Sequence, residues 1–377
     1  MREVVIIEGV RTAVGRRKGI HSGTRPDELA AEVLEELTSR AGVDKGLVED
    51  VILGCVTQSG EQGGNIARTA ALIAGFPDYV PGVTIDRQCG SSQQAVHFGS
   101  QAILSGDMEI VIAGGIESMT RSPMFSNMQG TEPSKKLTDR YEIINQGLSA
   151  ERIAEKWGIT RKELDAYAVQ SHKRALAAIE AGKYAQEIVP VGAPADEGPR
   201  EDTTEEVLAD LKPAFREDGQ ITAGNASQMS DGASAVLLMS GEKARELGLE
   251  AKARIIARAV VGSDPTLMLT GPIAATEKAL KKANLTIGDM DRYEVNEAFA
   301  PVPLAWLKET GADPEKLNVN GGAIALGHPL GATGTKLLVS LVHELERIGG
   351  RYGLLAICEG MGMANATVIE NLQRPDL

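Results

Sequence analysis

The sequence has few cysteines, few aromatic residues and no long apolar run, and each shortage excludes a class of protein. Three cysteines in 377 residues, none in a C-x-x-C pair, argue against a disulfide framework and a structural zinc site. Five Phe, six Tyr and two Trp are too few to predict a surface that stacks nucleic-acid bases. No stretch approaches about 18 apolar residues, and the first residues lack the pattern of a signal peptide, so we expect a cytoplasmic protein.

Positive charge is also in short supply. The chain carries 39 Lys and Arg against 52 Asp and Glu, a net charge of −13, which does not suit an extended interface with nucleic-acid phosphates. A few local basic residues could still bind a small anionic substrate. Glycine, by contrast, is abundant, and its 42 residues gather in clusters that predict tight turns and backbone that a ligand can approach closely.

Short apolar runs alternate with helical patterns, which predicts an α/β fold with a largely buried sheet. Residues 4–7, 50–56 and 109–115 are apolar runs of strand length. Residues 26–41 repeat apolar side chains every four positions, begin with a proline and are followed by Gly42, as expected of a capped helix.

The alternation stops between residues 119 and 230 and then resumes, which predicts an insertion between parts of two α/β halves. Residues 1–118 together with 231–252 form the predicted N-terminal half, 119–230 a loop-rich, partly helical domain, and 253–377 the C-terminal half. The second half weakly echoes the first, because Cys89 and His328 each follow a predicted strand and precede a predicted helix. Such turns carry the sites of α/β sheets, so the two halves are expected to bring these residues together.

Cys89 is the first candidate for chemistry. It lies in the turn QCGSS at 88–92, after a predicted strand and at the start of a predicted helix. A helix N-terminus favours a thiolate, so this position suits a nucleophile, although a single cysteine is in general more often a buried structural residue.

His328 is the second candidate. It lies in GHPLGATG at 327–334, where glycines and a proline fix the backbone, and a histidine held in such a turn suits a general base. The segment lacks the spacing of a P-loop or a dinucleotide fold, so a phosphate cradle is the weaker interpretation. Taken singly, Cys358 is better explained as a core residue and Asn296 as a helix cap.

Taken together, these segments resemble the thiolase family. The matching blocks, in chain order, are QCGSS at 88–92, GNAS at 224–227, NEAF at 296–299, GHPLGATG at 327–334 and Cys-Glu-Gly at 358–360. The resemblance runs from about residue 3 to 370. It implies a thiolase fold, in which two similar α/β halves form a layered α-β-α-β-α arrangement with a loop-rich helical insertion.

The resemblance also implies an activity, namely acyl transfer between coenzyme A thioesters through an acyl-enzyme on Cys89. It implies that His328 accepts the Cys89 proton, and that Cys358 protonates the leaving acetyl-CoA carbanion in cleavage or removes the α-proton in condensation. One oxyanion hole would consist of His328 and a water held by Asn296. The other would consist of the backbone N–H groups of Cys89 and Gly360.

The same resemblance implies that coenzyme A, a substrate and not a cofactor, lies against the 119–230 insertion. Ser227 would contact its pantetheine arm and Arg200 its nucleotide, although a solvated surface charge explains Arg200 equally well. No metal or redox cofactor is implied. A homo-oligomer is expected, and the compact segment near 119–145 favours a dimer over a tetramer.

One departure bears on the substrate. Asn145, Gln146 and Gly147 stand where short-chain biosynthetic thiolases carry His-Met-Gly. We therefore favour a degradative 3-ketoacyl-CoA thiolase, as in fatty acid β-oxidation, with a longer or bulkier acyl group. The alternatives are a biosynthetic thiolase that forms acetoacetyl-CoA, a ketosynthase, which the second cysteine disfavours, and a catalytically silent CoA-binding or assembly protein.

Overall fold

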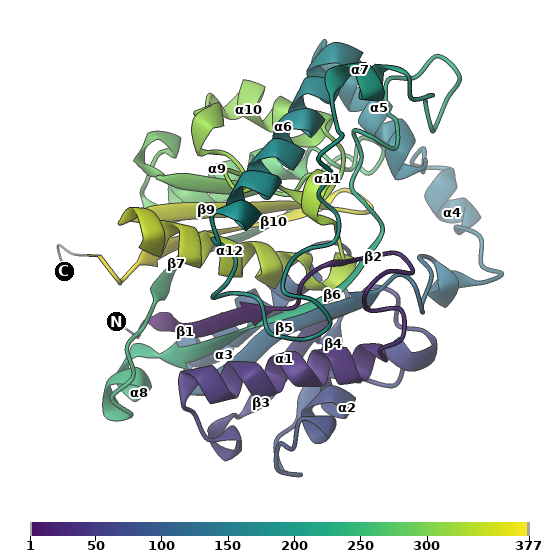
Figure 1. Cartoon of the computed structure of the whole chain (residues 1–377). Coiled ribbons are helices and arrows are strands. Elements are labelled where there is room, and N and C mark those ends of the chain that lie inside the picture. Colours follow the sequence, from purple (N-terminus) through teal and green to yellow (C-terminus); the bar gives the residue numbers. More distant parts are fainter. Residues whose placement is uncertain (1, 375–377) are drawn as a thin grey trace.

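The computed structural model describes residues 2–374 as a mixed sheet with helices on its faces (Figure 1). The strands are β1 (Val4–Arg11), β2 (Gly15–Arg16), β3 (Asp50–Gly54), β4 (Gly82–Ile85), β5 (Ile110–Ser118), β6 (Ser230–Ser240), β7 (Ala253–Gly262), β8 (Arg292–Val295), β9 (Tyr352–Glu359) and β10 (Met363–Asn371). Their order across the sheet is β4-β3-β5-β6-β1-β7-β10-β9-β8, and β2 pairs with β6.

The α/β halves contain helices of 4 to 16 residues. These are α1 (Pro26–Ala41), α2 (Ile66–Ile73), α3 (Ser91–Ser105), α8 (Gly241–Glu246), α9 (Gly271–Ala283), α10 (Pro301–Thr310), α11 (Ala323–Leu326) and α12 (Thr333–Ile348). Helix α1 has the predicted bounds, with Pro26 in its first turn and Gly42 in the left-handed conformation at its C-terminal cap.

The pairing of the strands repeats, which confirms the expected pair of similar halves. Strands β3 and β5 are parallel, and the chain then pairs antiparallel through β6 to β1. Strands β8 and β9 are likewise parallel, followed by antiparallel pairing through β10 to β7. The two halves join where β1 pairs with β7, over only Val5–Arg254 and Ile6–Ala253.

The layers are those expected of the α-β-α-β-α arrangement. Helices α1 and α2 cover the outside of the first half and α9 the outside of the second, whereas α3 and α12 pack on each other between the two halves (Figure 1). The buried residues follow these layers, and the cluster of the middle layer includes Cys89 and Leu337. The first turns of both central helices thus face the interior of the molecule.

The segment between β5 and β6 contains helices and no strand. These helices are α4 (Lys135–Thr138), α5 (Gln146–Lys156), α6 (Arg161–Glu180) and α7 (Glu205–Ala209). Thr160 and Glu163 form a capping box at the start of α6. Among residues 2–374, no helix is long and apolar enough to cross a membrane.

Candidate active site

Cys89 lies in the loop that leads from β4 into α3. Side chains hold this loop, because Asp86 Oδ1 accepts the backbone N–H of Gln88 at 2.6 Å and Ser91 Oγ accepts that of Arg87 at 2.8 Å. Gln88 has a φ of 47°, a left-handed conformation that turns the chain sharply just before the cysteine. The result is a free thiol that is 6% exposed at the start of a central helix.

Burial dominates the acidity of this thiol. It raises the pKa of Cys89 well above the usual value, and the neighbouring Cys358, Glu359 and Glu117 raise it further, whereas the backbone N–H of Cys89 itself opposes the shift. Burial thus opposes the thiolate that the helix N-terminus is expected to favour. Cys89 is a thiol at neutral pH and requires a base.

His328 has the tautomer that a base requires. Its Nδ1 lies 2.6 Å from Thr333 Oγ1, and that hydroxyl donates its own proton to the carbonyl of Pro329 at 2.9 Å. Thr333 Oγ1 must then accept the hydrogen bond from Nδ1–H, which leaves the lone pair on Nε2. Burial lowers the pKa of His328 to about 3, helped by nearby Lys336, so the ring is neutral at physiological pH.

Thr333 is thus expected to orient the base. In Thr333→Val, which keeps the shape but loses the hydroxyl, acyl-enzyme formation should slow by about 10²-fold, the lower end of what a positioned general base contributes. Thr333→Ser keeps the hydroxyl and should stay close to the wild-type rate. Rapid-quench measurement of acyl transfer to Cys89 checks both variants, and equal rates in the valine and serine proteins would contradict this role.

Cys358 is the last but one residue of β9 and lies fully buried beside the turn at 296–299. The side chain of Asn296 and the backbone N–H of Ala298 form hydrogen bonds to its sulfur, which favour the thiolate. Burial outweighs them and raises the pKa of Cys358 to about 12. Asn296 Nδ2 also lies 3.3 Å from His328 Nε2, so this one amide contacts the imidazole and the second thiol.

Glu297 fixes this turn in place. Its carboxylate accepts hydrogen bonds from Tyr167 and Ser171 of α6 at 2.9 and 2.7 Å, from Asn318 Nδ2 at 3.0 Å and from the backbone N–H of Ile324 at 3.1 Å. Four donors satisfy a buried carboxylate. Glu297 is therefore structural, and it ties the insertion to the turn that carries Asn296.

Glu117, at the end of β5, has a similar role that the sequence analysis missed. It accepts backbone N–H groups from Val56, Thr57 and Gly331 at 2.9, 3.0 and 2.9 Å, and Gln62 Nε2 at 3.1 Å. Gly331 belongs to the histidine segment, so Glu117 links that segment to the first half. Its donors are distant in the sequence, which leaves no local pattern that would identify it.

A narrow cavity of about 50 Å³ opens beside Cys89. It is lined by Val56, Thr57, Gln88, Cys89, Met124, Phe125, Asn127, Met128, Gln146 and Leu330. Met124, Phe125 and Met128 come from the insertion and are partly exposed, Phe125 by 58%. The sequence analysis did not identify this apolar wall. A Cβ added to Gly360 would lie 3.2 Å from Gln146 Nε2 and 3.0 Å from Gln88 Oε1, so the glycine keeps the mouth open.

The two predicted CoA-contacting residues lie in different surroundings. Ser227 is half-buried, and its backbone N–H donates to the carbonyl of Ala298 at 3.0 Å, next to Cys358. Arg200 is exposed, and its backbone N–H donates to His172 Nδ1 at 3.1 Å. The structure therefore brings Ser227, but not Arg200, to the group of Cys89, Asn296, His328 and Cys358.

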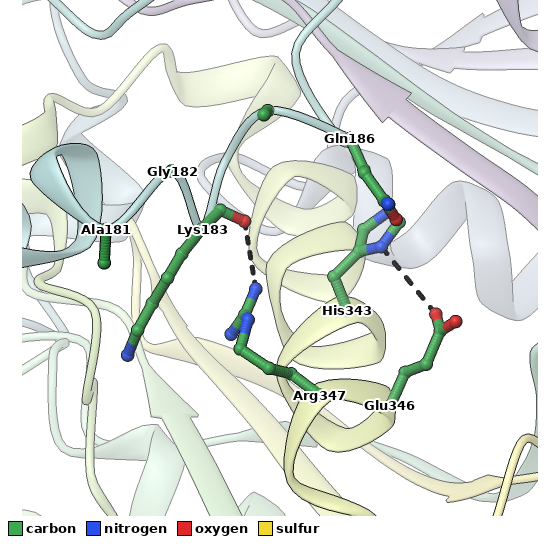
Figure 2. Close-up of a pocket in the computed structure, with 8 residues that line it drawn as sticks. Ala181, Gly182, Lys183, Gln186, His343, Glu346 and Arg347 are labelled. Carbon is green, nitrogen blue, oxygen red and sulfur yellow. Dashed lines mark hydrogen bonds and ion pairs between the residues drawn. The ribbon is translucent and has the colours of Figure 1, made fainter.

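A larger cavity lies elsewhere, between the end of α6 and the last turns of α12 (Figure 2). It measures about 460 Å³ and is lined by Ala181, Gly182, Lys183, Ala185, Gln186, His343, Glu346 and Arg347. Arg347 donates to the carbonyl of Lys183 at 2.9 Å and also contacts Glu344. None of the predicted site residues lines it, and no group of three His, Cys, Asp or Glu within 2–374 is arranged to hold a metal ion.

Comparison with known proteins finds relatives over almost the whole chain. Family models of the thiolase N-terminal and C-terminal domains match residues 4–242 and 249–371. The chain is 51% identical to a steroid 3-ketoacyl-CoA thiolase of Mycobacterium tuberculosis, over 99% of this chain and 95% of that one. It is 45% identical to an acetyl-CoA acetyltransferase of Pseudomonas aeruginosa, over 98% and 99% of the two chains.

A solved structure shows the same architecture. The crystal structure of the Bacillus anthracis acetyl-CoA acetyltransferase superposes with a TM-score of 0.92 at 43% identity and covers 99% of both chains. The similarity therefore extends over the insertion and both halves, and includes the two central helices that begin beside Cys89 and His328. With both family models matched and the fold shared along its full length, the chain belongs to the thiolase family.

Proposed function

We propose that this protein is a 3-ketoacyl-CoA thiolase that cleaves its substrate with coenzyme A through an acyl-enzyme on Cys89. The observation that carries the proposal is that two thiols and an imidazole share one buried site: Cys89 lies close enough to Cys358 to be affected by its charge, and Asn296 contacts both His328 and Cys358. A thiol nucleophile, a base and a separate thiol acid are the groups that carbon–carbon cleavage of a 3-ketoacyl thioester requires.

In the first half-reaction, His328 Nε2 takes the proton of Cys89 and the thiolate attacks the 3-keto carbon. The backbone N–H groups of Cys89 and Gly360 hold the oxygen of the tetrahedral intermediate. The bond between carbons 2 and 3 then breaks, and its electrons pass to the departing acetyl-CoA as an enolate. Protonated His328 and Asn296 stabilise the enolate oxygen, and Cys358 gives its proton to the carbon.

The second half-reaction restores both thiols. The Cys358 thiolate takes the proton of an incoming coenzyme A, whose sulfur attacks the acyl carbon on Cys89. The intermediate collapses to the shortened acyl-CoA and a Cys89 thiolate, which recovers its proton from His328. Each cysteine thus ends the cycle with one proton, and no external acid or oxidant is needed.

The activity is tested with a panel of 3-ketoacyl-CoA substrates from acetoacetyl-CoA to bulky chains. We expect acetyl-CoA to form continuously only when coenzyme A is present. Without coenzyme A, the reaction should stop after about one acetyl-CoA per protein, with an acyl mass increase on the Cys89 peptide. The proposal would be contradicted if no member of the panel gave acetyl-CoA and if fresh, reduced protein formed no adduct on Cys89.

The apolar wall of the cavity favours substrates larger than acetoacetyl-CoA. Phe125→Ala removes apolar contact, so kcat/KM for a long or bulky substrate should fall by about tenfold relative to acetoacetyl-CoA. Phe125→Leu keeps an apolar side chain and should lose less. Competition between a short and a long substrate in one mixture measures the ratio directly, and an unchanged ratio in the alanine variant would mean that the acyl chain does not contact Phe125.

The expected homodimer is also part of this proposal. Strand β4 is an edge of the sheet, and apolar side chains are exposed on it, on α2 that packs against it, and on α3. They are Leu72, Ile73, Val83, Phe98 and Leu104. An apolar edge of this kind favours pairing with a second copy. Light scattering in solution tests the dimer, and location in the cytoplasm stays a prediction.

A further inference from the structure

Glu359 lies between Cys358 and Gly360 and takes no part in the chemistry derived above. Its side chain is fully buried, and within the described part of the chain neither carboxyl oxygen has a hydrogen-bond partner. An ionised carboxylate without donors is very costly to bury, whereas a neutral carboxyl is far less so. The surroundings alone therefore favour the protonated acid.

The other buried glutamates of the site show what a charged carboxylate receives in this protein. Glu117 accepts four hydrogen bonds, three of them from backbone N–H groups, and Glu297 also accepts four. Glu359, at the same depth, accepts none. The three carboxyl groups differ in the hydrogen-bond donors around them and not in their burial. Glu359 therefore differs from the two structural glutamates, Glu117 and Glu297.

The carboxyl group of Glu359 lies directly behind the nucleophile turn. A Cβ added to Gly90 would collide with Glu359 Oε1 and lie 2.8 Å from Asn365 Nδ2. Asn365 in turn donates to the carbonyl of Gly90 at 2.9 Å. The glycine next to Cys89 therefore makes room for this acid.

The charged groups that face Glu359, Arg87 and Asp86, both come from the loop that carries Cys89. Burial raises the pKa of Glu359 to about 9, Arg87 opposes this and Asp86 adds to it. Arg87 Nη1 contacts Met363 Sδ of β10 at 3.6 Å. On the other side, a charge on Glu359 is among the causes that raise the pKa of both Cys89 and Cys358.

We propose that Glu359 is a positioning residue for Cys89, whose uncharged carboxyl fills the space behind Gly90 and whose ionisation, in alkaline solution, disables the nucleophile. The charged form places a negative group behind the turn where the thiolate and the oxyanion must form. The effect on turnover rests on the proposed function, whereas the effect on the reactivity of the thiol does not.

The reactivity of each thiol gives the first test. Wild-type protein and Glu359→Gln are alkylated with iodoacetamide across a pH series, and each cysteine peptide is quantified by mass spectrometry. In Glu359→Gln the midpoint for Cys89 should move to lower pH by about one unit, the size of a nearby-charge effect. The peptide of Cys55, whose pKa depends on Glu117 and Asp86, should not move. An unchanged Cys89 midpoint overturns the proposal.

The protonated acid itself can be observed without any turnover. Burial also raises the pKa of Glu294 and of Glu117, so the band of Glu359 is isolated by subtraction. The infrared spectrum of the wild-type protein minus that of Glu359→Gln should show a buried carboxylic C=O band at neutral pH that fades as the pH passes about 9. Glu370→Gln is the matched control. Glu370 is also buried but pairs with Arg254 and Arg351, so its removal should leave the band in place. A difference spectrum without such a band contradicts a neutral Glu359.

The pH dependence of the thiolysis rate then tests whether Glu359 affects turnover. The wild-type rate should fall above about pH 9, by up to about tenfold per pH unit, and Glu359→Gln should keep its rate over that range. If the Cys89 midpoint shifts but neither protein cleaves any substrate, the inference about Glu359 stands and the proposed function fails. If both proteins cleave substrate with the same alkaline limit, the proposed function stands and the inference about Glu359 fails.

Discussion

Cys89→Ala protein is expected to form no acyl-enzyme, and its thiolysis rate should fall by roughly 10⁴-fold or more, as when the nucleophile of a comparable covalent enzyme is removed. The reason is that no other group at the site can hold the acyl chain: Cys358 lies beside Asn296 as the acid, and His328 is the base. Single-turnover assays with mass analysis of the Cys89 peptide measure the effect.

Cys55→Ala is the matched control for that experiment. Cys55 is a free cysteine, as buried as Cys89, but it follows β3 and does not line the cavity beside Cys89. Its replacement should leave turnover within a few-fold of wild type, so a loss confined to position 89 reports chemistry and not packing. Equal losses at both positions would argue against a nucleophile.

Cys358→Ala is expected to separate the two half-reactions. Transfer of an acetyl group from acetyl-CoA to Cys89 uses Cys358 only to protonate the departing coenzyme A thiolate, which is a good leaving group, so it should persist at a reduced rate. Exchange of the α-protons of acetyl-CoA with deuterated solvent requires a group that removes a proton from carbon and returns a deuteron, and it should fall by about 10³-fold, within the range for a positioned acid–base group. Thiolysis should fall with it.

Two assays on the same sample give the readout. The mass of the Cys89 peptide reports acyl transfer, and the deuterium content of recovered acetyl-CoA reports proton transfer at carbon. Loss of both would mean that Cys358 supports the nucleophile and not the carbanion. Undiminished exchange would assign the acid role to another group.

Local sequence patterns were sufficient to predict those parts of the site that are formed by a single segment of the chain. The turn around Cys89 and the segment around His328 could be located because glycines, a proline and a following helix fix the backbone within a few residues. Helix α1 was predicted with its bounds for the same reason, since its proline and its capping glycine are adjacent to it in the chain.

The parts of the site that depend on contacts between residues distant in the sequence could not be predicted from local patterns. The contact of Asn296 with Cys358 requires β8 to pair with β9, and the bonds to Glu117 join segments from both halves. Phe125 reaches the cavity from a backbone with a φ of 69°, which its sequence does not indicate. The burial that raises the pKa of Cys89 could not be predicted either, because the motif shows the helix and not the depth of the turn.

The narrow join between the halves has a consequence for how the protein loses activity. Cys89 belongs to the first half, whereas His328 and Cys358 belong to the second, and the sheet continues from one half to the other over only two residue pairs of β1 and β7. Parting along this seam would separate Cys89 from His328 and Cys358 while the outer cores stayed folded. The packing of α3 on α12 and the hydrogen bond from Gly331 to Glu117 resist it. On heating, activity would then be lost at a lower temperature than the one at which the protein unfolds. The difference between these two temperatures would measure the stability of the contact between the halves.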